Sequence, residues 1–243
     1  MNMKSFLFAF ALIIVNAATY AQDRKVGVVT FYADKTIDLS QVNATADFVA
    51  KNTSLSEDPK FNLEAPLKKF HSEFFASYVK NFPFQVVDEN SITSNTTYVN
   101  YTPGNDNMGV KYEDKLFEKI EGYKVIRPFT PNVKEVAAMA NELGVDGIMF
   151  VYLYFDFNKT AIGKLGYFSI RAHVAIDLYD KNGKSIFQFN ELAGSKKKVP
   201  MVGGWPVMDP DKIQPMCEDA IAELMEDMNK KLERLAKKVD RKF

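Results

Sequence analysis

The central feature of the hydrophobic pattern is a nearly continuous apolar run from Ile148 to Phe157, bounded by Gly147 and Asn158. Residues at both odd and even positions are apolar, as in a strand that is covered on both faces of its sheet. The ten residues of the run are too few for a membrane-spanning helix, which needs about 20 apolar residues. They also lack the apolar–polar alternation of a membrane β-hairpin. We therefore predict a central buried strand here, rather than a membrane segment or a ligand cradle.

Other segments show the apolar content or the alternation of strands. The clearest alternation is in Tyr167–Tyr179, and the Asn182-Gly183 pair that follows it is typical of a two-residue hairpin turn. A short edge strand is predicted at Tyr123–Phe129. The remaining predicted strands are Lys25–Tyr32, Phe84–Val87 and Lys184–Phe189.

Three long helices are predicted from apolar residues that recur at steps of three and four. The first carries its stripe from Leu63 to Tyr78 and ends before Pro83. The second begins at Thr130 or Asn132 and ends at Gly144, where glycine suits a left-handed cap. The third runs from near Pro215 to about Val239.

These elements follow the order β-α-β-α-β-β-β-α, which predicts an α/β fold with a mixed five-stranded sheet and helices on both faces. The expected strand order is 2-1-3-4-5. We expect one domain over residues 22–243, with long loop insertions at 33–60 and 88–122, the latter including a short helix near 112–120. No internal repeat or interdomain linker is visible.

The first 21 residues have the pattern of a secretory signal peptide: Lys4, an apolar core from Phe6 to Val15, and small residues before Ala21. Gln22 follows, whereas a lipoprotein would carry cysteine there. We therefore expect an exported protein, periplasmic or secreted, without a lipid anchor and without a transmembrane segment in the mature chain. The single cysteine, Cys217, allows no internal disulfide.

The charge balance is close to neutral. Removal of residues 1–21 takes away one lysine and no acid, which leaves 30 basic and 31 acidic residues. Such a balance provides no general attraction to nucleic acid or to anionic lipid. Nucleic acid is therefore not an expected partner.

The helix ending in Leu-Gly-Val-Asp-Gly-Ile, the long strand after it and the Tyr-Asp-Lys-Asn-Gly-Lys hairpin resemble a known family. It is the periplasmic α/β domain of curli-secretion lipoproteins, of penicillin-binding-protein activator lipoproteins and of the TolB amino-terminal domain. The pattern covers residues 25–239. The resemblance implies a non-enzymatic assembly or regulatory role in the cell envelope. Two departures are the missing lipidated cysteine and the missing pore-forming hairpins of the secretion channel.

Few residues have the types and spacings that catalysis requires. The chain has two histidines, His71 and His173, too few for a three-histidine zinc site. It has no HExxH, GxSxG, P-loop or GxGxxG motif and no paired CxxC, so no cofactor is implied. Cys217 falls near the apolar side of the last helix and is interpreted as a small buried residue, not a nucleophile.

One polar cluster has acid–base potential. Arg171, His173 and Asp177 alternate along one predicted strand and therefore share a face. A histidine beside a carboxylate and an arginine can transfer protons. The competing interpretation is a polar sheet face or a buried network, because no nucleophile or metal-ligand set accompanies the cluster.

The predicted topology places the long connections at one end of the sheet. Ligands of open α/β sheets bind at the carboxyl ends of the parallel strands, and long irregular loops are often functional. This loop-rich edge is the expected interaction surface. The connections are 33–60, 88–122, 158–166 and 194–209, and the candidate residues are Trp205, Tyr98, Tyr101, Lys196, Lys197 and Lys198.

Three functions remain open. The first is a non-enzymatic envelope protein that binds another protein or a cell-wall component through a flat loop surface. The second is a small-ligand-binding protein with an apolar cavity lined by Tyr152, Tyr154 and Tyr167. The third is a hydrolase or transferase with a deep pocket at His173 and Asp177 and an added nucleophile.

Overall fold

A computed structural model describes residues 24–40, 42, 45–104, 114–162, 165–201 and 209–240, and the structural statements below concern these residues. The predicted signal peptide, residues 1–21, and the predicted interaction residue Trp205 lie outside them.

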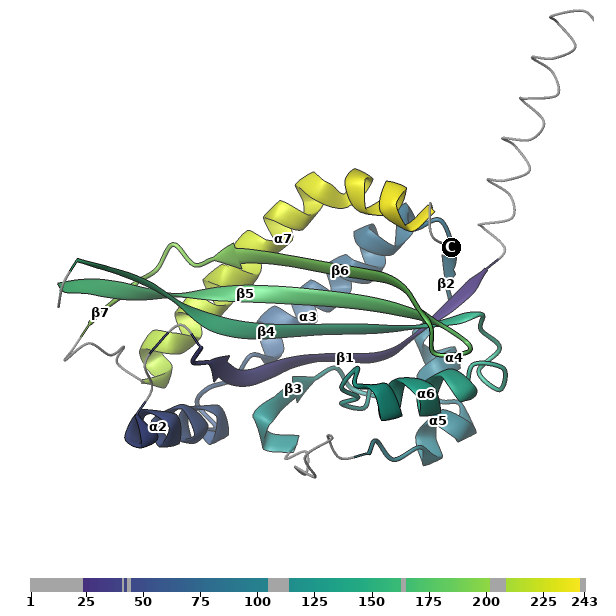
Figure 1. Cartoon of the computed structure of the whole chain (residues 1–243), viewed down its shortest axis with the longest axis horizontal. Coiled ribbons are helices and arrows are strands. Elements are labelled where there is room, and N and C mark those ends of the chain that lie inside the picture. Colours follow the sequence, from purple (N-terminus) through teal and green to yellow (C-terminus); the bar gives the residue numbers. More distant parts are fainter. Residues whose placement is uncertain are drawn as a thin grey trace, which may run out of the picture.

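The core of the fold is a curled mixed sheet with the strand order β2-β1-β4-β5-β6 (Figure 1). The first three strands are mutually parallel, and β5 and β6 continue the sheet in antiparallel fashion. This order confirms the predicted 2-1-3-4-5. Within the described residues the sheet nevertheless has seven strands, because short β3 pairs with β1 and short β7 pairs with β5. The strands are β1 (Lys25–Asp38), β2 (Gln85–Val86), β3 (Phe117–Lys119), β4 (Gly147–Ile162), β5 (Leu165–Asp180), β6 (Ser185–Gly194) and β7 (Val199–Pro200).

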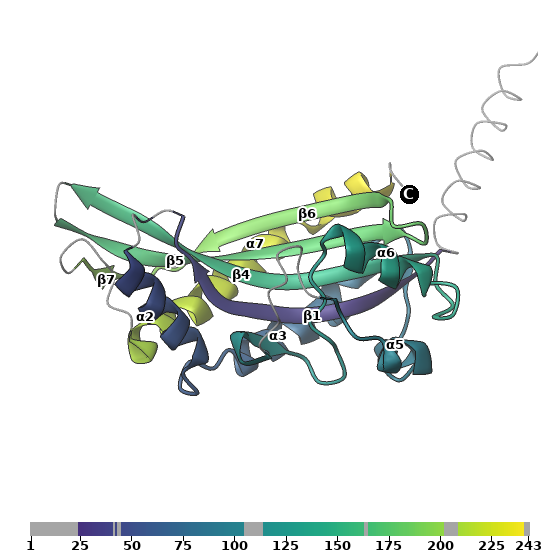
Figure 2. The same cartoon turned by 60° about the horizontal axis from the view of Figure 1, so that its bottom comes forward.

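Helices cover both faces of the sheet and create two hydrophobic cores. The larger core lies on the face that carries α3 and α7, and the smaller one lies beneath α4, α5 and α6 on the other face (Figures 1 and 2). The helices are α2 (Ala46–Glu57), α3 (Glu64–Glu73), α4 (Glu89–Thr93), α5 (Thr96–Asn100), α6 (Thr130–Ala138) and α7 (Pro210–Asp240).

β4 is the central strand that the apolar run predicts. Met149, Val151 and Leu153 enter the larger core, whereas Ile148 and Phe150 enter the smaller one. All five side chains are fully buried. Burial on both faces explains why the run has no polar period.

The first predicted loop insertion, 33–60, is largely regular structure. β1 continues to Asp38, and α2 follows at Ala46–Glu57 with Thr45 as its amino-terminal cap. α2 lacks a recognisable apolar stripe because two of its four buried residues, Asn52 and Ser56, are polar. The sequence pattern therefore does not show the helix.

The second predicted insertion, 88–122, contains α4, α5 and β3. Asp88 and Asn95 cap the two short helices by accepting backbone N–H groups. A short helix was expected near 112–120; the described part of this segment, from residue 114 on, has a 3-10 turn at Asp114–Leu116, and strand β3 follows it directly.

The predicted edge strand at Tyr123–Phe129 is not a strand. Hydrogen bonds from two side chains, and not pairing with a neighbouring strand, hold this segment in position. The Thr30 hydroxyl donates to the Lys124 carbonyl (2.7 Å) and accepts from the Ile126 N–H (3.2 Å). The Tyr98 hydroxyl accepts from the Lys124 N–H at 2.9 Å. Because side chains satisfy these backbone groups, the segment crosses the sheet without joining it.

The remaining differences concern element ends. The expected connection at 158–166 is largely the continuation of β4 and β5, which pair as far as Ile162 and Leu165. β6 extends to Gly194, and the region after it contains β7. α7 begins at Pro210, capped by Asp209, so Pro215 lies inside the helix. The first long helix is α3 followed by a π-helical turn, Phe74–Tyr78, and a 3-10 turn, Val79–Asn81.

Two glycines have the backbone that their turns require. α6 ends at Ala138, capped by Met139, and not at Gly144 as predicted. The chain continues in turns to Gly144, whose φ of +69° is the left-handed conformation predicted for it. Gly183 has φ +75° in the β5–β6 hairpin. The Asp180 N–H donates to the Lys184 carbonyl at 3.0 Å, and the Lys184 N–H donates to the Asp180 carboxylate at 2.9 Å. The connection between β5 and β6 is therefore longer than the predicted two residues.

Candidate ligand-binding groove

A groove of about 740 Å³ lies on the sheet face that carries α6. Among the described elements, α4, α5 and α6 cover the part of this face where β1 and β4 begin, and the groove lies beyond them toward the carboxyl ends of these strands (Figure 2). Aromatic, acidic and basic side chains from three segments share the lining. They are Tyr32, Asp34, Thr36, Asp38, Arg127, Pro128, Phe129, Tyr152, Tyr154 and Phe155.

An irregularity of β1 opens the sheet at this point. Ala33 pairs with Leu153 and Ile37 with Phe155, so three residues of β1 stand opposite the single residue Tyr154. At such an insertion the strand bends, and the backbone groups of the extra residues do not pair with the neighbouring strand. Asp34 stabilises the bow by accepting the N–H of Thr36 at 2.8 Å.

α2 satisfies carbonyl groups at the irregularity. Asn52 Nδ2 donates to the Ile37 carbonyl at 2.8 Å, and Ser56 Oγ donates to the Lys35 carbonyl at 3.1 Å. Both donors are buried. Because a buried carbonyl without a partner is costly, α2 stabilises the conformation of β1 that forms one side of the groove.

The segment between the Tyr98 anchor and α6 supplies another side. The Thr30 and Tyr98 hydroxyls fix Lys124 and Ile126, and the chain then passes through Arg127, Pro128 and Phe129. Asn132, fully buried in α6, donates to the Arg127 carbonyl at 3.2 Å. These contacts hold Arg127 in the groove lining.

Two stacked pairs of rings lie next to each other at the groove. The rings of Tyr32 and Tyr152 are nearly parallel with centroids 5.5 Å apart, and those of Tyr154 and His173 stack at 4.6 Å. Tyr152 and Tyr154 join the two pairs at 6.1 Å. The row therefore runs from β1 across β4 to β5 and gives the groove an aromatic floor.

Asp177 lies next to this row, on β5. Its side chain is 5% exposed, and the Tyr152 hydroxyl donates to its Oδ2 at 3.4 Å. Burial raises the pKa of Asp177 to about 6, although the Tyr152 hydroxyl acts in the opposite direction. Near neutral pH this carboxyl group therefore titrates, unlike an ordinary aspartate.

Asp156 is the acidic partner that sequence analysis missed. Arg171 donates to it through Nε at 2.8 Å and through a second nitrogen, and His173 Nε2 lies 3.3 Å from Oδ2, without the alignment of a good hydrogen bond. Burial by itself raises the pKa of Asp156, but the His173 and Arg171 contacts lower it below its usual value. The pairing of Asp156 with Arg171 across β4 and β5 is the only signal that would have identified it.

The predicted cluster of Arg171, His173 and Asp177 is thus divided. All three lie on one strand and one face, as predicted. Arg171 and His173 contact Asp156, whereas Asp177 contacts Tyr152. Asp34, Thr36 and Asp38 also escaped prediction, because the consecutive polar residues Asp34, Lys35 and Thr36 interrupt the apolar pattern that indicates a strand.

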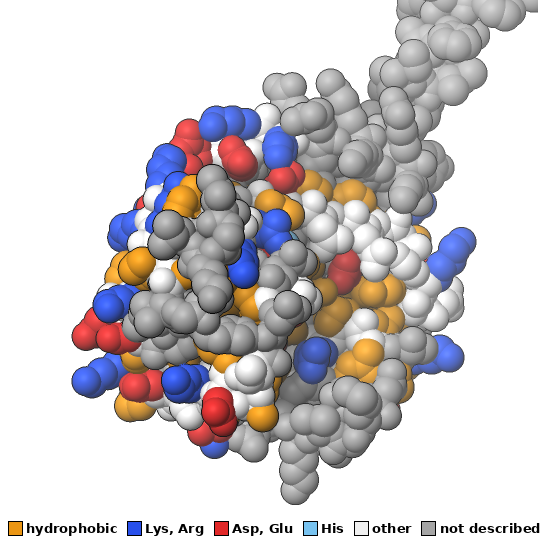
Figure 3. Space-filling model, turned by 60° about the vertical axis from the view of Figure 1, so that its left-hand side comes forward, with side chains coloured by type: hydrophobic (Ala, Val, Ile, Leu, Met, Phe, Trp, Pro, Cys, Tyr) orange, Lys and Arg blue, Asp and Glu red, His pale blue; other side chains and the backbone are white. Residues whose placement is uncertain are grey.

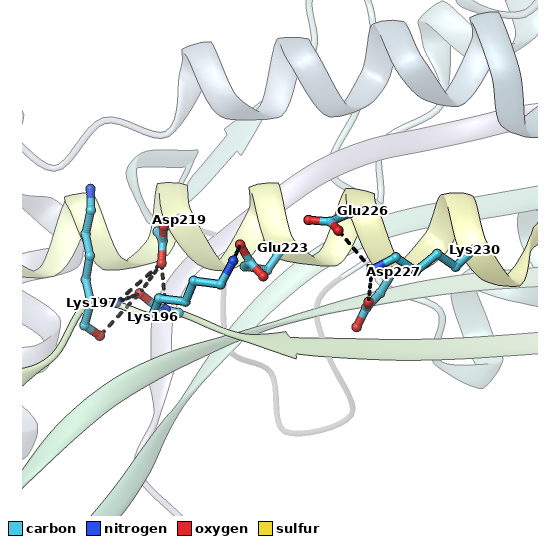
Figure 4. Close-up of polar contacts among 8 residues, drawn as sticks. Lys196, Lys197, Asp219, Glu223, Glu226, Asp227 and Lys230 are labelled. Atoms are coloured by element: carbon cyan, nitrogen blue, oxygen red, sulfur yellow. Dashed lines mark hydrogen bonds and ion pairs between the residues drawn. The ribbon is translucent and has the colours of Figure 1, made fainter.

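The lysine run at 196–198, predicted to bind a partner, makes hydrogen bonds and ion pairs within the protein (Figure 4). Asp219 of α7 accepts the Ser195 hydroxyl at 2.8 Å and the Lys196 N–H at 2.7 Å, and the Lys196 ammonium pairs with Glu223. The Lys198 ammonium lies 4.1 Å from the centre of the Tyr167 ring. The run therefore joins β6 to α7, and Lys197 takes part through its N–H, 3.4 Å from Asp219.

The two predicted interaction tyrosines have structural contacts. Tyr98 is fully buried, and its hydroxyl donates to the Val29 carbonyl at 2.8 Å. The Tyr101 hydroxyl donates to Glu135 at 3.2 Å. Tyr98 contributes to the groove indirectly, by positioning the segment that carries Arg127. Cys217 is also fully buried, and burial raises the pKa of its thiol, as its interpretation as a core residue requires.

The described surface shows no large field of one sign on the face seen in Figure 3. Lysine and arginine side chains are interspersed there with aspartate and glutamate. Within the described ranges, no group of three or more His, Cys, Asp or Glu side chains is arranged to hold a metal ion. None of the described helices combines the length and apolar character needed to cross a bilayer.

Comparisons with known proteins assign no family. No protein-family model and no curated protein sequence matches the chain. Among solved structures, the hypothetical protein CT253 from Chlamydia trachomatis is similar over 88% of this chain and 98% of that chain, with a TM-score of 0.29 and 10% sequence identity. We therefore derive the function below from the groove itself.

Proposed function

We propose that the protein is an exported, non-enzymatic binding protein that holds a small ligand in the sheet-face groove. The observation that carries this proposal is the groove of about 740 Å³ beside the irregular pairing of β1 opposite Tyr154. Its volume is within the range of about 300–1,000 Å³ that small-molecule sites occupy. Aromatic rings form its floor, and polar groups converge on it from two further segments.

The side chains at the groove favour binding over catalysis. Asp34 accepts the Thr36 N–H, and Asp38 accepts both the N–H and the hydroxyl of Ser40. His173 is stacked on Tyr154, and its Nε2 lies 3.3 Å from Asp156 Oδ2. A general base needs a nucleophile within hydrogen-bond reach, and the hydroxyl groups of the lining belong to Thr36 and to tyrosines.

The groove is also a better candidate for the binding site than the loop-rich edge, because the residues predicted to bind a partner at that edge have contacts within the protein. Two of the lysines expected to bind a partner there have contacts within the protein: Lys196 pairs with Glu223 of α7, and Lys198 lies over the ring of Tyr167 in β5. Tyr98 is buried beneath the segment that it anchors. The groove instead brings together residues far apart in the sequence, such as Asp34, Arg127 and Tyr154, in one cavity.

Native mass spectrometry tests the proposal directly. The purified protein is incubated with an envelope extract below 1 kDa from the cells that produce it. We expect a bound adduct with the wild type and its loss in Thr36→Trp, where the exposed Thr36 is replaced by a ring that fills the groove. The matched control is Thr53→Trp on the exposed side of α2.

The proposal fails if the wild type captures no small molecule. It also fails if Thr36→Trp retains the adduct, because the ligand then occupies another site. Circular dichroism of both tryptophan variants shows that any loss of binding is not a loss of folding.

A further inference from the structure

The outermost long strand of the sheet, β6, has an open hydrogen-bonding edge. Among the described strands only β5 pairs with it, and β6 ends the order β2-β1-β4-β5-β6 (Figures 1 and 2). We infer that two copies of this chain pair through β6, antiparallel about a two-fold axis, and form one continuous sheet. The lining of the groove comes from other segments, so this inference stands independently of the proposed function.

Alternate residues of β6 direct their backbone groups away from the sheet. Ser195, which follows β6, donates its N–H to the Ile170 carbonyl at 2.7 Å and so belongs to a hydrogen-bonded pair with β5. Such pairs alternate along an antiparallel ladder, and the register is regular from Gly194 back to Phe187. The residues whose N–H and C=O groups point outward are therefore Gln188, Asn190, Leu192 and Gly194.

β6 lacks the features that protect an exposed edge. Natural edge strands are short, or carry lysine, proline or a bulge. β6 is ten residues long and has neither lysine nor proline, whereas β2, at the opposite end of the strand order, has two residues. The irregularity in the pairing of β6 lies at its start, opposite Leu178 and Tyr179. The rest of the strand is a regular edge that a further strand can join.

The side chains of this edge suit the approach of an identical strand. Near a two-fold axis each side chain meets its own copy, so a charged side chain there would be repelled. The β6 side chains on the face that carries α6 are uncharged and exposed: Gln188, Asn190 and Leu192. The charged residue of β6, Glu191, lies on the other face, where Lys231 of α7 pairs with its carboxylate at 2.6 Å.

The best register places Asn190 opposite Asn190 of the second copy. Gln188 then faces the second copy's Leu192, and the two Asn190 amides can each donate and accept. A shift toward the end of the strand would set Glu191 directly opposite its own copy. A shift the other way would set Leu192 opposite Ile186, which the irregularity leaves out of the ladder. Only short β2 remains at each end of the strand order, so the assembly closes at two chains.

Sedimentation velocity with charge variants tests the pairing. We expect the mass of the purified protein to rise from one chain to two between about 1 and 100 µM. Asn190→Lys and Asn190→Asp each set like charges opposite each other, and each alone is expected to raise the dissociation constant of the dimer about ten-fold. An equimolar mixture of the two variants is expected to recover the mass of two chains, because opposite charges then face each other.

The matched control is Thr53→Lys on the exposed side of α2, which is expected to dimerise like the wild type. Circular dichroism of the three variants shows that any loss of the dimer is not a loss of folding. A wild type that keeps the mass of one chain throughout overturns the inference. An Asn190→Lys variant that dimerises like the wild type overturns it too, as does a mixture that stays at one chain, because Asn190 then does not face its own copy.

Discussion

The side-chain amide of Asn52 donates a 2.8 Å hydrogen bond to the main-chain carbonyl of Ile37. The two residues lie in α2 and at the end of β1, where β1 departs from regular pairing with β4. The bond supplies a partner to a backbone group at the irregularity that opens the groove. Asn52 is not one of the residues that line the groove, but it supports the conformation of the strand that does.

Removal of this bond is expected to destabilise the protein. Asn52→Ala leaves the Ile37 carbonyl without its donor in a buried position, which costs about 1–3 kcal/mol in the free energy of unfolding. Urea denaturation measures the loss. Thr53→Ala, one residue away on the exposed side of the same helix, is the matched control and is expected to have a much smaller effect. Equal effects of the two changes would contradict the role given to Asn52.

Loss of Arg171 is expected to lower the free energy of unfolding far more than loss of an exposed lysine that also pairs with a carboxylate. Arg171→Gln leaves the buried Asp156, 6% exposed, without its bidentate partner, which we expect to cost about 2–4 kcal/mol. The exposed pair of Lys230 with Glu226 on α7 is the comparison (Figure 4). Lys230→Gln is expected to leave the urea midpoint unchanged, because exposed ion pairs contribute little. A smaller shift for Arg171→Gln than for Lys230→Gln would refute the assignment.

The stacking of Tyr154 on His173 is expected to contribute to the stability of the fold. Tyr154→Phe keeps the ring on His173 and is expected to preserve stability. Tyr154→Leu removes the ring and is expected to cost about 1 kcal/mol more than Tyr154→Phe, the contribution of an aromatic pair beyond its burial. Thermal and urea denaturation of both variants give the difference. If the leucine variant is as stable as the phenylalanine variant, the stacking contributes nothing.

Asp177 is expected to make the protein less stable as the pH rises from about 4 to about 6. Its folded-state pKa of about 6 lies above the ordinary value of 3.8 because burial favours the neutral form. The folded protein therefore holds this proton more tightly than the unfolded chain. The contribution of Asp177 to the free energy of unfolding is greatest below about pH 4 and is lost as the proton leaves. The total loss is about 2–3 kcal/mol, since one pKa unit corresponds to about 1.4 kcal/mol.

The variant Asp177→Asn isolates this effect. It removes the titration while keeping a polar side chain beside Tyr152, so the fall in stability between pH 4 and 6 is expected to be smaller by that amount. Asp47→Asn, in the exposed first turn of α2, is the control and should retain the fall. Denaturation curves at half-unit pH intervals measure all three proteins. A wild-type profile that the Asp177 variant reproduces unchanged would show that another group titrates.

Part of the candidate site was visible in the sequence. The alternation of β5 correctly placed Arg171, His173 and Asp177 on one face. The apolar run correctly placed Tyr152 and Tyr154 in the central strand. Their charged neighbours were not visible, because Asp34 and Asp38 fall where the chain turns polar, and Arg127 falls in a segment whose apolar residues suggested a strand.

Sequence alone determined the central strand and the glycine turns at Gly144 and Gly183, because each depends on a local period or on one residue's backbone freedom. The order of the five main strands followed from the order of the elements and the rules for their connections, which did not reveal β3 and β7. Only the tertiary structure decided where the groove lies. Its shape depends on the irregular pairing of β1 with β4, on Asn52 and Ser56 reaching across from α2, and on Thr30 and Tyr98 holding the segment before Arg127. These are hydrogen bonds between polar side chains and distant backbone groups, and such bonds leave no period in the sequence.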